Sequence, residues 1–257
     1  FTALNNDLLL EENYLSELLN GVLKSPRIAT CTGKLKSWNF IEKDNYNNGK
    51  TNYIDSTGLL INKEHRFTDR GQGEIDHGQY DKEEEIFGAS GTAVMYRISC
   101  LEDTAYINEK SEKEYFDELM FMYKEDVDLA YRLQRAGYQA IYNPKAVGYH
   151  DRTVNSRGNS LLAIVKNRWN RNKIYKEWSW INHHIILKKM IDKDYQGNVK
   201  LKTWWYEFKS FIYILFFEPF ILKQYWQLFK LRDKIKARRE QIKIRIKATE
   251  LTEKWMS

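Results

Sequence analysis

Three carboxylates open a segment whose apolar residues recur at helical spacing. Glu125, Asp126 and Asp128 lie at its start, apolar residues follow at every third or fourth position, and Gly137 comes directly after the last of them. This spacing predicts a helix over residues 125–136, with the glycine as its C-terminal stop. Acids at a helix N-terminus can be ordinary helix-dipole partners worth ~0.3–1 kcal/mol each, or they can accept protons in a reaction.

A second polar group interrupts an apolar strand near the start of the chain. Asn5, Asn6 and Asp7 are followed by three leucines, and His150 ends another predicted strand after the helix with the acids. Buried strands do not tolerate unpartnered polar side chains, so we expect Asp7 at a strand end, facing a ligand or a cation. A carboxylate with an imidazole suits Mn²⁺, and Mg²⁺ less typically, because imidazole prefers transition metals. Taken alone, Asn-Asn-Asp more often marks a simple turn.

Further motifs lie between and around these two groups in a fixed order. They are Ile-Asp-Ser-Thr-Gly at 54–58, Asp-Arg-Gly-Gln-Gly-Glu-Ile-Asp at 69–76, Phe-Gly-Ala-Ser-Gly-Thr-Ala-Val-Met-Tyr-Arg at 87–97, Tyr-Phe-Asp-Glu at 115–118, Glu-Asp-Val-Asp at 125–128 and Tyr-His-Asp-Arg-Thr at 149–153. This succession resembles the inverting family 2 glycosyltransferases, in particular their bacterial rhamnosyltransferase-like branch. The resemblance is close over residues 1–155 and looser from there to the end.

The resemblance implies an α/β fold of the GT-A type, a Rossmann-like domain that binds a nucleotide sugar. It also implies that the chain starts inside that domain, because the family carries several strand–helix units before its metal-binding motif. At ~30 residues or more for each unit, roughly 80–100 residues would be missing. We therefore expect a catalytic domain over 1–155 that lacks its N-terminal nucleotide-binding strands. A helical, basic, membrane-associating extension is expected over 156–257.

The resemblance also assigns roles to single residues. Asp126 falls on the family's base, and Glu125 beside it orients the acceptor or shares that role. Asp7 and His150 fall on the metal site, which would hold Mn²⁺ or Mg²⁺. The implied substrate-binding residues are Asn5, Asn6, Ser90, Gly91, Asp128 and Arg152. The implied substrates are a nucleotide-sugar donor, with dTDP-rhamnose suggested, and a glycan or polyprenyl-linked acceptor.

Three positions depart from the family pattern. Asn5 stands where the family has the first acid of its metal motif, so an oxygen ligand is kept and its charge is lost. Ile98 follows Arg97 where the family has paired arginines, and Leu119 replaces an acid that is common after Phe-Asp-Glu. None of the three removes the base or the histidine.

Two rival functions use the same residues differently. Another metal-dependent phosphate-transfer enzyme, such as a nucleotidyltransferase, could use the same aspartate and histidine ligands, but it would not need a base aimed at a sugar hydroxyl. A non-catalytic membrane-binding module would use the acids only for structure. Replacing Asp126 by asparagine would abolish only glycosyl transfer.

Composition indicates an intracellular protein with one domain and an appendage. The chain has 257 residues, enough to bury a full core. Its only cysteines, Cys31 and Cys100, offer neither a disulfide framework nor metal-ligand spacing, so we expect buried thiols in a reducing compartment.

Charge is concentrated near the C-terminus. Residues 223–247 contain ten basic and two acidic residues, a net charge of +8, whereas the whole chain carries +6. The apolar run 211–222 precedes them, but twelve residues with Glu218 and Pro219 are too few for a transmembrane helix, which needs ~20. One interpretation is a core helix broken at Pro219 and then a solvated basic helix.

The other interpretation is an amphipathic anchor in the plane of a membrane, with cations that meet anionic lipid. Aromatic residues flank the apolar run on both sides, as interface anchors do: Trp204, Trp205, Tyr206, Tyr225 and Trp226. Nucleic acid is not expected as a partner, because no base-reading motif accompanies the basic run. We therefore expect a cytoplasmic protein, peripheral on the inner face of the plasma membrane.

Overall fold

The chain forms two compact units in a computed structural model that describes residues 1–39, 49–151 and 172–256. The first unit comprises Phe1–Leu60, Thr68–Cys100 and Tyr138–Arg171, and the second comprises Ile61–Phe67, Leu101–Gly137 and Asn172–Ser257. The units therefore do not divide at the expected boundary of residue 155. The segment that carries Glu125 and Asp126 clusters with the C-terminal helices instead.

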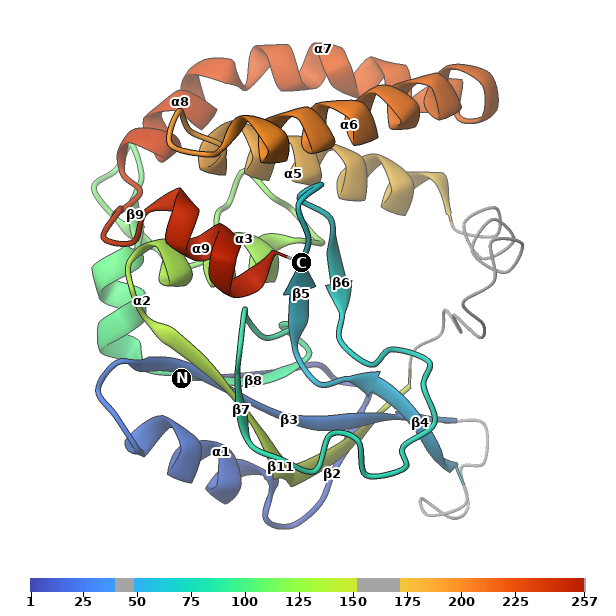
Figure 1. Ribbon diagram of the computed structural model, residues 1–257, viewed down its shortest axis with the longest axis vertical. Coiled ribbons are helices and arrows are strands. Elements are labelled where there is room, and N and C mark those ends of the chain that lie inside the picture. The colour runs from blue at the N-terminus through green and yellow to red at the C-terminus, as the bar shows by residue number, and fades with distance from the viewer. Residues whose placement is uncertain (40–48, 152–171, 257) are drawn as a thin grey trace. The chain divides into compact units, whose positions relative to one another are not determined.

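A mixed seven-stranded sheet forms the centre of the first unit (Figure 1). Its strands are β1 (Thr2–Leu4), β8 (Ala93–Tyr96), β3 (Ile28–Trp38), β11 (Gln139–His150) and β2 (Leu8–Leu10) in spatial order, with β4 (Lys50–Ser56) paired to β3 and β7 (Glu84–Ile86) paired to β11. Strands β3 and β11 are parallel, and the other pairs are antiparallel. The predicted α/β class is confirmed at this level.

Helix α1 (Tyr14–Leu23) packs along this sheet through one apolar face (Figure 1). Tyr14, Leu18 and Val22 recur every four residues and are 0%, 0% and 5% exposed. They contact the side chains that β3 and β11 turn toward the helix, including Leu35 and Ala146. The Tyr14 hydroxyl donates to a main-chain carbonyl of β8 at 2.9 Å, which satisfies the one polar atom of this contact.

Helices dominate the second unit. They are α3 (Glu125–Arg135), α5 (Lys173–Met190), α6 (Gly197–Phe217), the 3₁₀ turn η1 (Pro219–Leu222), α7 (Lys223–Lys230), α8 (Arg232–Glu240) and α9 (Ala248–Trp255). A short two-stranded sheet pairs β9 (Tyr106–Ile107) with β10 (Lys113–Glu114). Three of the boundaries between the units fall within short elements, β5 (Leu59–Ile61), β6 (Phe67–Asp69) and α2 (Ile98–Thr104). The predicted helix at 125–136 and the break at Pro219 are confirmed. Gly137 ends α3 with φ +83°, a left-handed conformation that favours glycine.

A buried cluster of ion pairs connects α3 to α5. The Lys189 ammonium lies 2.5 Å from Asp117 and 2.5 Å from Asp128, and all three side chains are 0% exposed. Arg132 adds a bond from Nε to Asp128 at 3.0 Å. Buried charges are tolerated when each is paired, and removal of one partner leaves the others uncompensated. This cluster therefore fixes the position of α3 within the second unit.

No helix among the described residues has the length and apolar character needed to cross a bilayer.

Candidate functional site

Strand pairing in the first unit brings Asp7 and His150 together, as predicted. Strand β2 runs antiparallel to the end of β11, with Leu8 opposite His150. The Asp151 amide donates to the Asp7 carbonyl at 3.0 Å, which continues this pairing by one step. The two side chains then face each other, with 3.4 Å between Asp7 Oδ1 and His150 Nε2.

Asp55 of β4 completes this group, and sequence reasoning did not assign it a role. Its Oδ2 lies 2.8 Å from His150 Nδ1, and Asp55 and His150 are 3% and 4% exposed. A carboxylate can only accept here, so the hydrogen is on Nδ1 and Nε2 is presented to Asp7. The available signal was an acid directly after the apolar residue Ile54 within a strand, where a buried charge needs a partner.

The Asp7–His150 pair has the donors that a divalent cation needs. Asp7 Oδ1 is buried and makes no hydrogen bond to any residue that the structure describes, although the imidazole lies close to it. An acid behind the far ring nitrogen, as Asp55 is here, is the usual support of a metal-binding histidine. The described residues contain no group of three or more His, Cys, Asp or Glu side chains placed to hold an ion. The pair would thus supply two ligands and leave the other positions to water and phosphate oxygens.

Two of the predicted substrate-binding segments of the first unit, those of Asn5 and Ser90, are linked through Thr92. The Asn5 amide donates to the Thr92 carbonyl at 2.8 Å, and the Ser90 hydroxyl lies 3.1 Å from the Thr92 hydroxyl. Asn5 and Asn6 are exposed, whereas Ser90 and Gly91 are half-buried. Thr92 therefore joins the turn that contains Asn5 to the loop that contains Ser90. The sixth predicted residue of this kind, Arg152, lies outside the described residues.

The start of α3 has a strained backbone that a buried amide holds. Tyr123 and Lys124, the two residues before the helix, both have φ +68°, a left-handed conformation that side chains disfavour. The Asn182 side-chain amide of α5 donates to the carbonyls of Met122 and Tyr123, at 2.7 Å each, and Asn182 is 0% exposed. The amide fixes the turn that aims the first residues of α3.

Glu125 and Asp126 follow this turn and differ in their surroundings. Burial, helped by the charge of Asp126, raises the pKa of Glu125 to about 7. Glu125 Oε2 is buried and has no hydrogen-bond partner among the described residues. Asp126 Oδ1 accepts from the Val127 amide at 2.8 Å. A helix N-terminus favours the charged form of an acid, and at Glu125 the loss of hydration outweighs this effect.

Asp128 has a structural role, which corrects the prediction of a substrate contact. Its side chain is 0% exposed and is paired with Lys189 and Arg132. It therefore presents no accessible surface to a sugar or a phosphate. Sequence spacing could not show this, because Lys189 lies on a helix sixty residues further along the chain.

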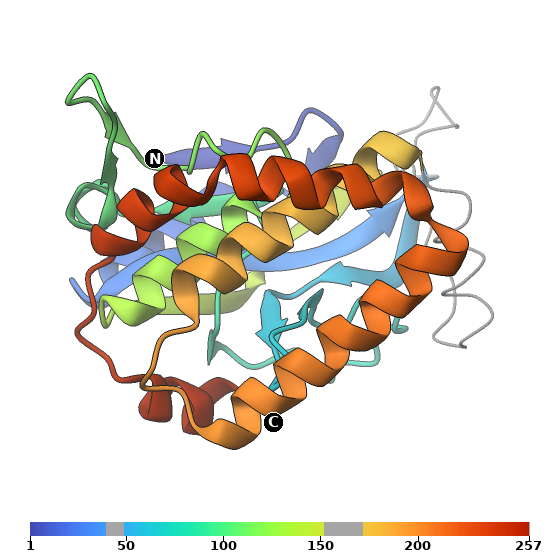
Figure 2. The same ribbon diagram turned by 90° about the horizontal axis from the view of Figure 1, so that it is seen from above.

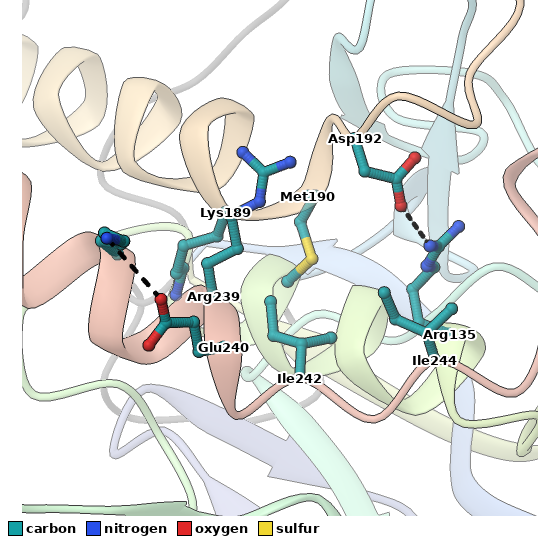
Figure 3. A pocket seen from close by; sticks show the side chains of 9 residues that line it. Arg135, Lys189, Met190, Asp192, Arg239, Glu240, Ile242 and Ile244 are labelled. Atoms are coloured by element: carbon teal, nitrogen blue, oxygen red, sulfur yellow. Dashed lines mark hydrogen bonds and ion pairs between the residues drawn. The ribbon is translucent and has the colours of Figure 1, made fainter.

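A cavity of about 510 Å³ lies elsewhere in the second unit (Figure 3). Its nine lining residues include none of the predicted site residues. Arg135 and Asp192, 2.5 Å apart, line one end, and Arg239 and Glu240 line the other (Figure 3). The lysine of the buried ion cluster also contributes to the lining. This cavity borders the structural ion pairs and is not the site that the sequence predicted.

No protein-family model and no curated protein matches this chain. Among solved structures, a crystal structure described as GalNAc-T7 with UDP, GalNAc and Mn²⁺ matches with a TM-score of 0.48 and 13% sequence identity. The match covers 99% of this chain and 42% of that chain, so this chain spans less than half the length of the solved protein. A likeness of this size identifies no family.

Proposed function

We propose that this protein is an inverting glycosyltransferase of the GT-A type, in the rhamnosyltransferase-like branch of family 2. It would move a sugar, with rhamnose as the first candidate, from a nucleotide diphosphate donor to a glycan or polyprenyl-linked acceptor. The observation that carries the proposal is the Asp7–His150–Asp55 group at the edge of the sheet. It supplies the donors for a divalent cation in the motif order that resembles this family.

A divalent ion, Mn²⁺ or Mg²⁺, would neutralise the diphosphate of the donor as it leaves. Asp7 and His150 would hold it, and Asp55 would keep the ring of His150 in the required tautomer. Asn5 and Asn6 would offer amide groups to the donor from the turn between β1 and β2. Ser90 and Gly91 would form the floor of the sugar pocket, where the missing side chain of glycine lets substrate approach the backbone.

Asp126 would act as the base in the transfer step. The acceptor hydroxyl oxygen attacks the anomeric carbon and forms the new glycosidic bond. The bond from that carbon to the phosphate oxygen breaks, the diphosphate keeps the electron pair, and Asp126 takes the hydroxyl proton. Glu125 would bind an acceptor hydroxyl beside it, since its pKa of about 7 lets it donate or accept near neutral pH.

The reaction would take place at a membrane, because a polyprenyl-linked acceptor resides there. We propose a cytoplasmic protein that is peripheral on the inner face of the plasma membrane, without nucleic acid as a partner.

Mn²⁺ binding to the purified protein, followed by electron paramagnetic resonance, tests the metal assignment without any turnover. Asp7→Ala and His150→Ala should each abolish tight binding, since each removes one of two protein ligands. Asp55→Asn should weaken it by ~10–100-fold, the usual effect of losing the acid behind a metal-bound histidine. Glu12→Gln, at an exposed acid of the same unit, is the control and should bind as the wild type does. Unchanged Mn²⁺ affinity in Asp7→Ala and His150→Ala would overturn the metal assignment.

A further inference from the structure

Helix α6 exposes an apolar stripe along its whole length. Its buried residues are only Val199, Thr203 and Ile214. Seven exposed apolar residues recur every three or four residues on one side of the helix: Leu201, Trp204, Trp205, Phe208, Ile212, Leu215 and Phe216, between 39% and 72% exposed. Phe211 and Phe217 are exposed as well. Amphipathic helices of a folded domain normally turn this stripe to the core. On α6 it points to solvent.

Helix α7 also exposes apolar side chains. Trp226 and Phe229 are 61% and 52% exposed, and their rings stack with centroids 5.6 Å apart. The turn η1 joins the end of α6 to the start of α7, and both helices contact it (Figures 1 and 2). We call the exposed side chains of α6 and α7 the aromatic face.

Most of the charges that residues 197–230 carry are positive, although Lys223 is paired with Glu177 of α5 at 2.9 Å. Residues 197–230 contain five lysines, Lys200, Lys202, Lys209, Lys223 and Lys230, and no arginine. Both acids of this segment are engaged inward. Glu207 lies 2.9 Å from His183 and 3.1 Å from His184, and Glu218, 3% exposed, lies 3.0 Å from Lys176.

The basic tail beyond α7 is less available than the sequence suggested. Arg238 lies 2.5 Å from Glu114 and is only 11% exposed. Lys243 and Arg245 lie 2.6 Å and 2.7 Å from Asp103. Arg239 donates to the Lys188 carbonyl at 3.1 Å. These cations hold the C-terminal segment in place, which corrects the expectation of a uniformly solvated basic helix.

We propose that the aromatic face lies in the plane of a membrane and binds anionic lipid headgroups through its lysines. The apolar rings would enter the boundary between headgroups and acyl chains, and Lys202, Lys209 and Lys230 would reach phosphate. Lys200 is less available, because its ammonium donates to the Lys193 carbonyl at 2.8 Å. A second copy of the chain fits this surface less well, because protein interfaces are depleted in lysine. This proposal names the membrane partner of the proposed function, on which it rests.

Flotation with vesicles tests the proposal on the purified protein. Wild type should float with phosphatidylcholine vesicles that contain phosphatidylglycerol and should dissociate as salt rises. Trp204→Ser, Phe208→Ser and Phe216→Ser combined should lower the partition coefficient by about tenfold or more. The matched control is Leu15→Ser, Leu19→Ser and Leu23→Ser combined on α1, where three leucines are 45%, 47% and 65% exposed. It should float as the wild type does.

A charge variant separates the electrostatic contribution. Lys202→Gln, Lys209→Gln and Lys230→Gln combined should weaken binding to the anionic vesicles by about fivefold for each lysine, and should leave binding to pure phosphatidylcholine unchanged. Brominated lipids should quench the fluorescence of the wild type through the tryptophans of the face. Circular dichroism melts of each variant confirm that it is folded.

Two results would overturn the proposal. One is undiminished flotation of the folded aromatic variant. The other is a wild-type protein that sediments as a dimer while the aromatic variant sediments as a monomer. That result would make the face a surface for self-association. Flotation and Mn²⁺ binding are measured independently. A failure here therefore leaves the metal result intact, and a failure of the metal assignment leaves the flotation result intact.

Discussion

The acids at the start of α3 have different surroundings. Burial raises the pKa of Glu125 to about 7, whereas Asp126 Oδ1 accepts a hydrogen bond from the Val127 amide. Glu125 can therefore hold or release a proton near neutral pH. A pair of this kind can separate proton acceptance from substrate binding.

Asp126→Asn tests which acid accepts the proton. The substitution keeps the size of the side chain and removes its basicity, so donor binding should stay within a few fold. Transfer should fall by ~10²–10⁴, the usual contribution of a general base. Initial rates and donor titrations of the variant and of Glu125→Gln measure both effects. A rate above about a tenth of wild type in Asp126→Asn would exclude Asp126 as the base.

Glu125 should also make stability depend on pH. Its pKa rises from 4.5 to about 7 on folding, so the folded protein binds this proton more tightly. The stability that the neutral acid contributes is present at low pH and is lost as pH rises toward and through 7. As pH rises from 5 to 8, the melting temperature of Glu125→Gln should therefore increase relative to that of wild type. Glu118→Gln, at an exposed acid of the same unit, should show no such gain. A pH-independent difference for Glu125→Gln would contradict the raised pKa.

Some of these residues could be found from sequence and some could not. Asp7 and His150 were paired by motif order, and the antiparallel register of β2 with β11 then brings them together. Asp55 was missed because its contact with His150 reaches over β3, and strand order is not readable from local spacing. Asp128 was misassigned because the ion pair that buries it involves a distant helix.

At the scale of elements, α3 depends on α5. Its helical extent and its glycine stop follow from spacing alone, and the structure confirms both. The turn before α3 cannot be predicted from spacing, because Asn182 and Lys189 contact this region from a segment that the sequence presents as a separate extension. Helix α5 is thus part of the framework that positions the candidate base.

Asn182→Leu should loosen the start of α3. It keeps the volume of the side chain and leaves the Met122 and Tyr123 carbonyls without their donor, at a cost of about 1–3 kcal/mol in the free energy of unfolding. Amide hydrogen exchange should quicken over residues 121–128 and the transfer rate should fall. Mn²⁺ affinity, which depends on the first unit, should not change. Gln227→Leu, at an exposed position of α7, is the control. If amide hydrogen exchange over residues 121–128 is as slow in Asn182→Leu as in wild type, the turn does not depend on Asn182.

At the scale of the whole molecule, the candidate residues are distributed over two units. The first carries the metal-site candidates Asp7 and His150, and the second carries Glu125, Asp126 and the aromatic face. The sequence predicted an α/β part and a helical part, but it placed the boundary at 155. Residues 61–67 and 101–137 cluster with the C-terminal helices through non-local contacts that no pattern along the chain reports.

The central claim is transfer of a sugar with inversion and release of a nucleoside diphosphate. Phosphorus and proton nuclear magnetic resonance of the reaction with dTDP-rhamnose, and then with other nucleotide sugars, follows the leaving group and the anomeric configuration together. We predict a released nucleoside diphosphate and an inverted anomeric centre in the presence of Mn²⁺ or Mg²⁺, with both lost in Asp126→Asn. Release of a nucleoside monophosphate, retention of configuration, or full turnover in excess EDTA would contradict this account.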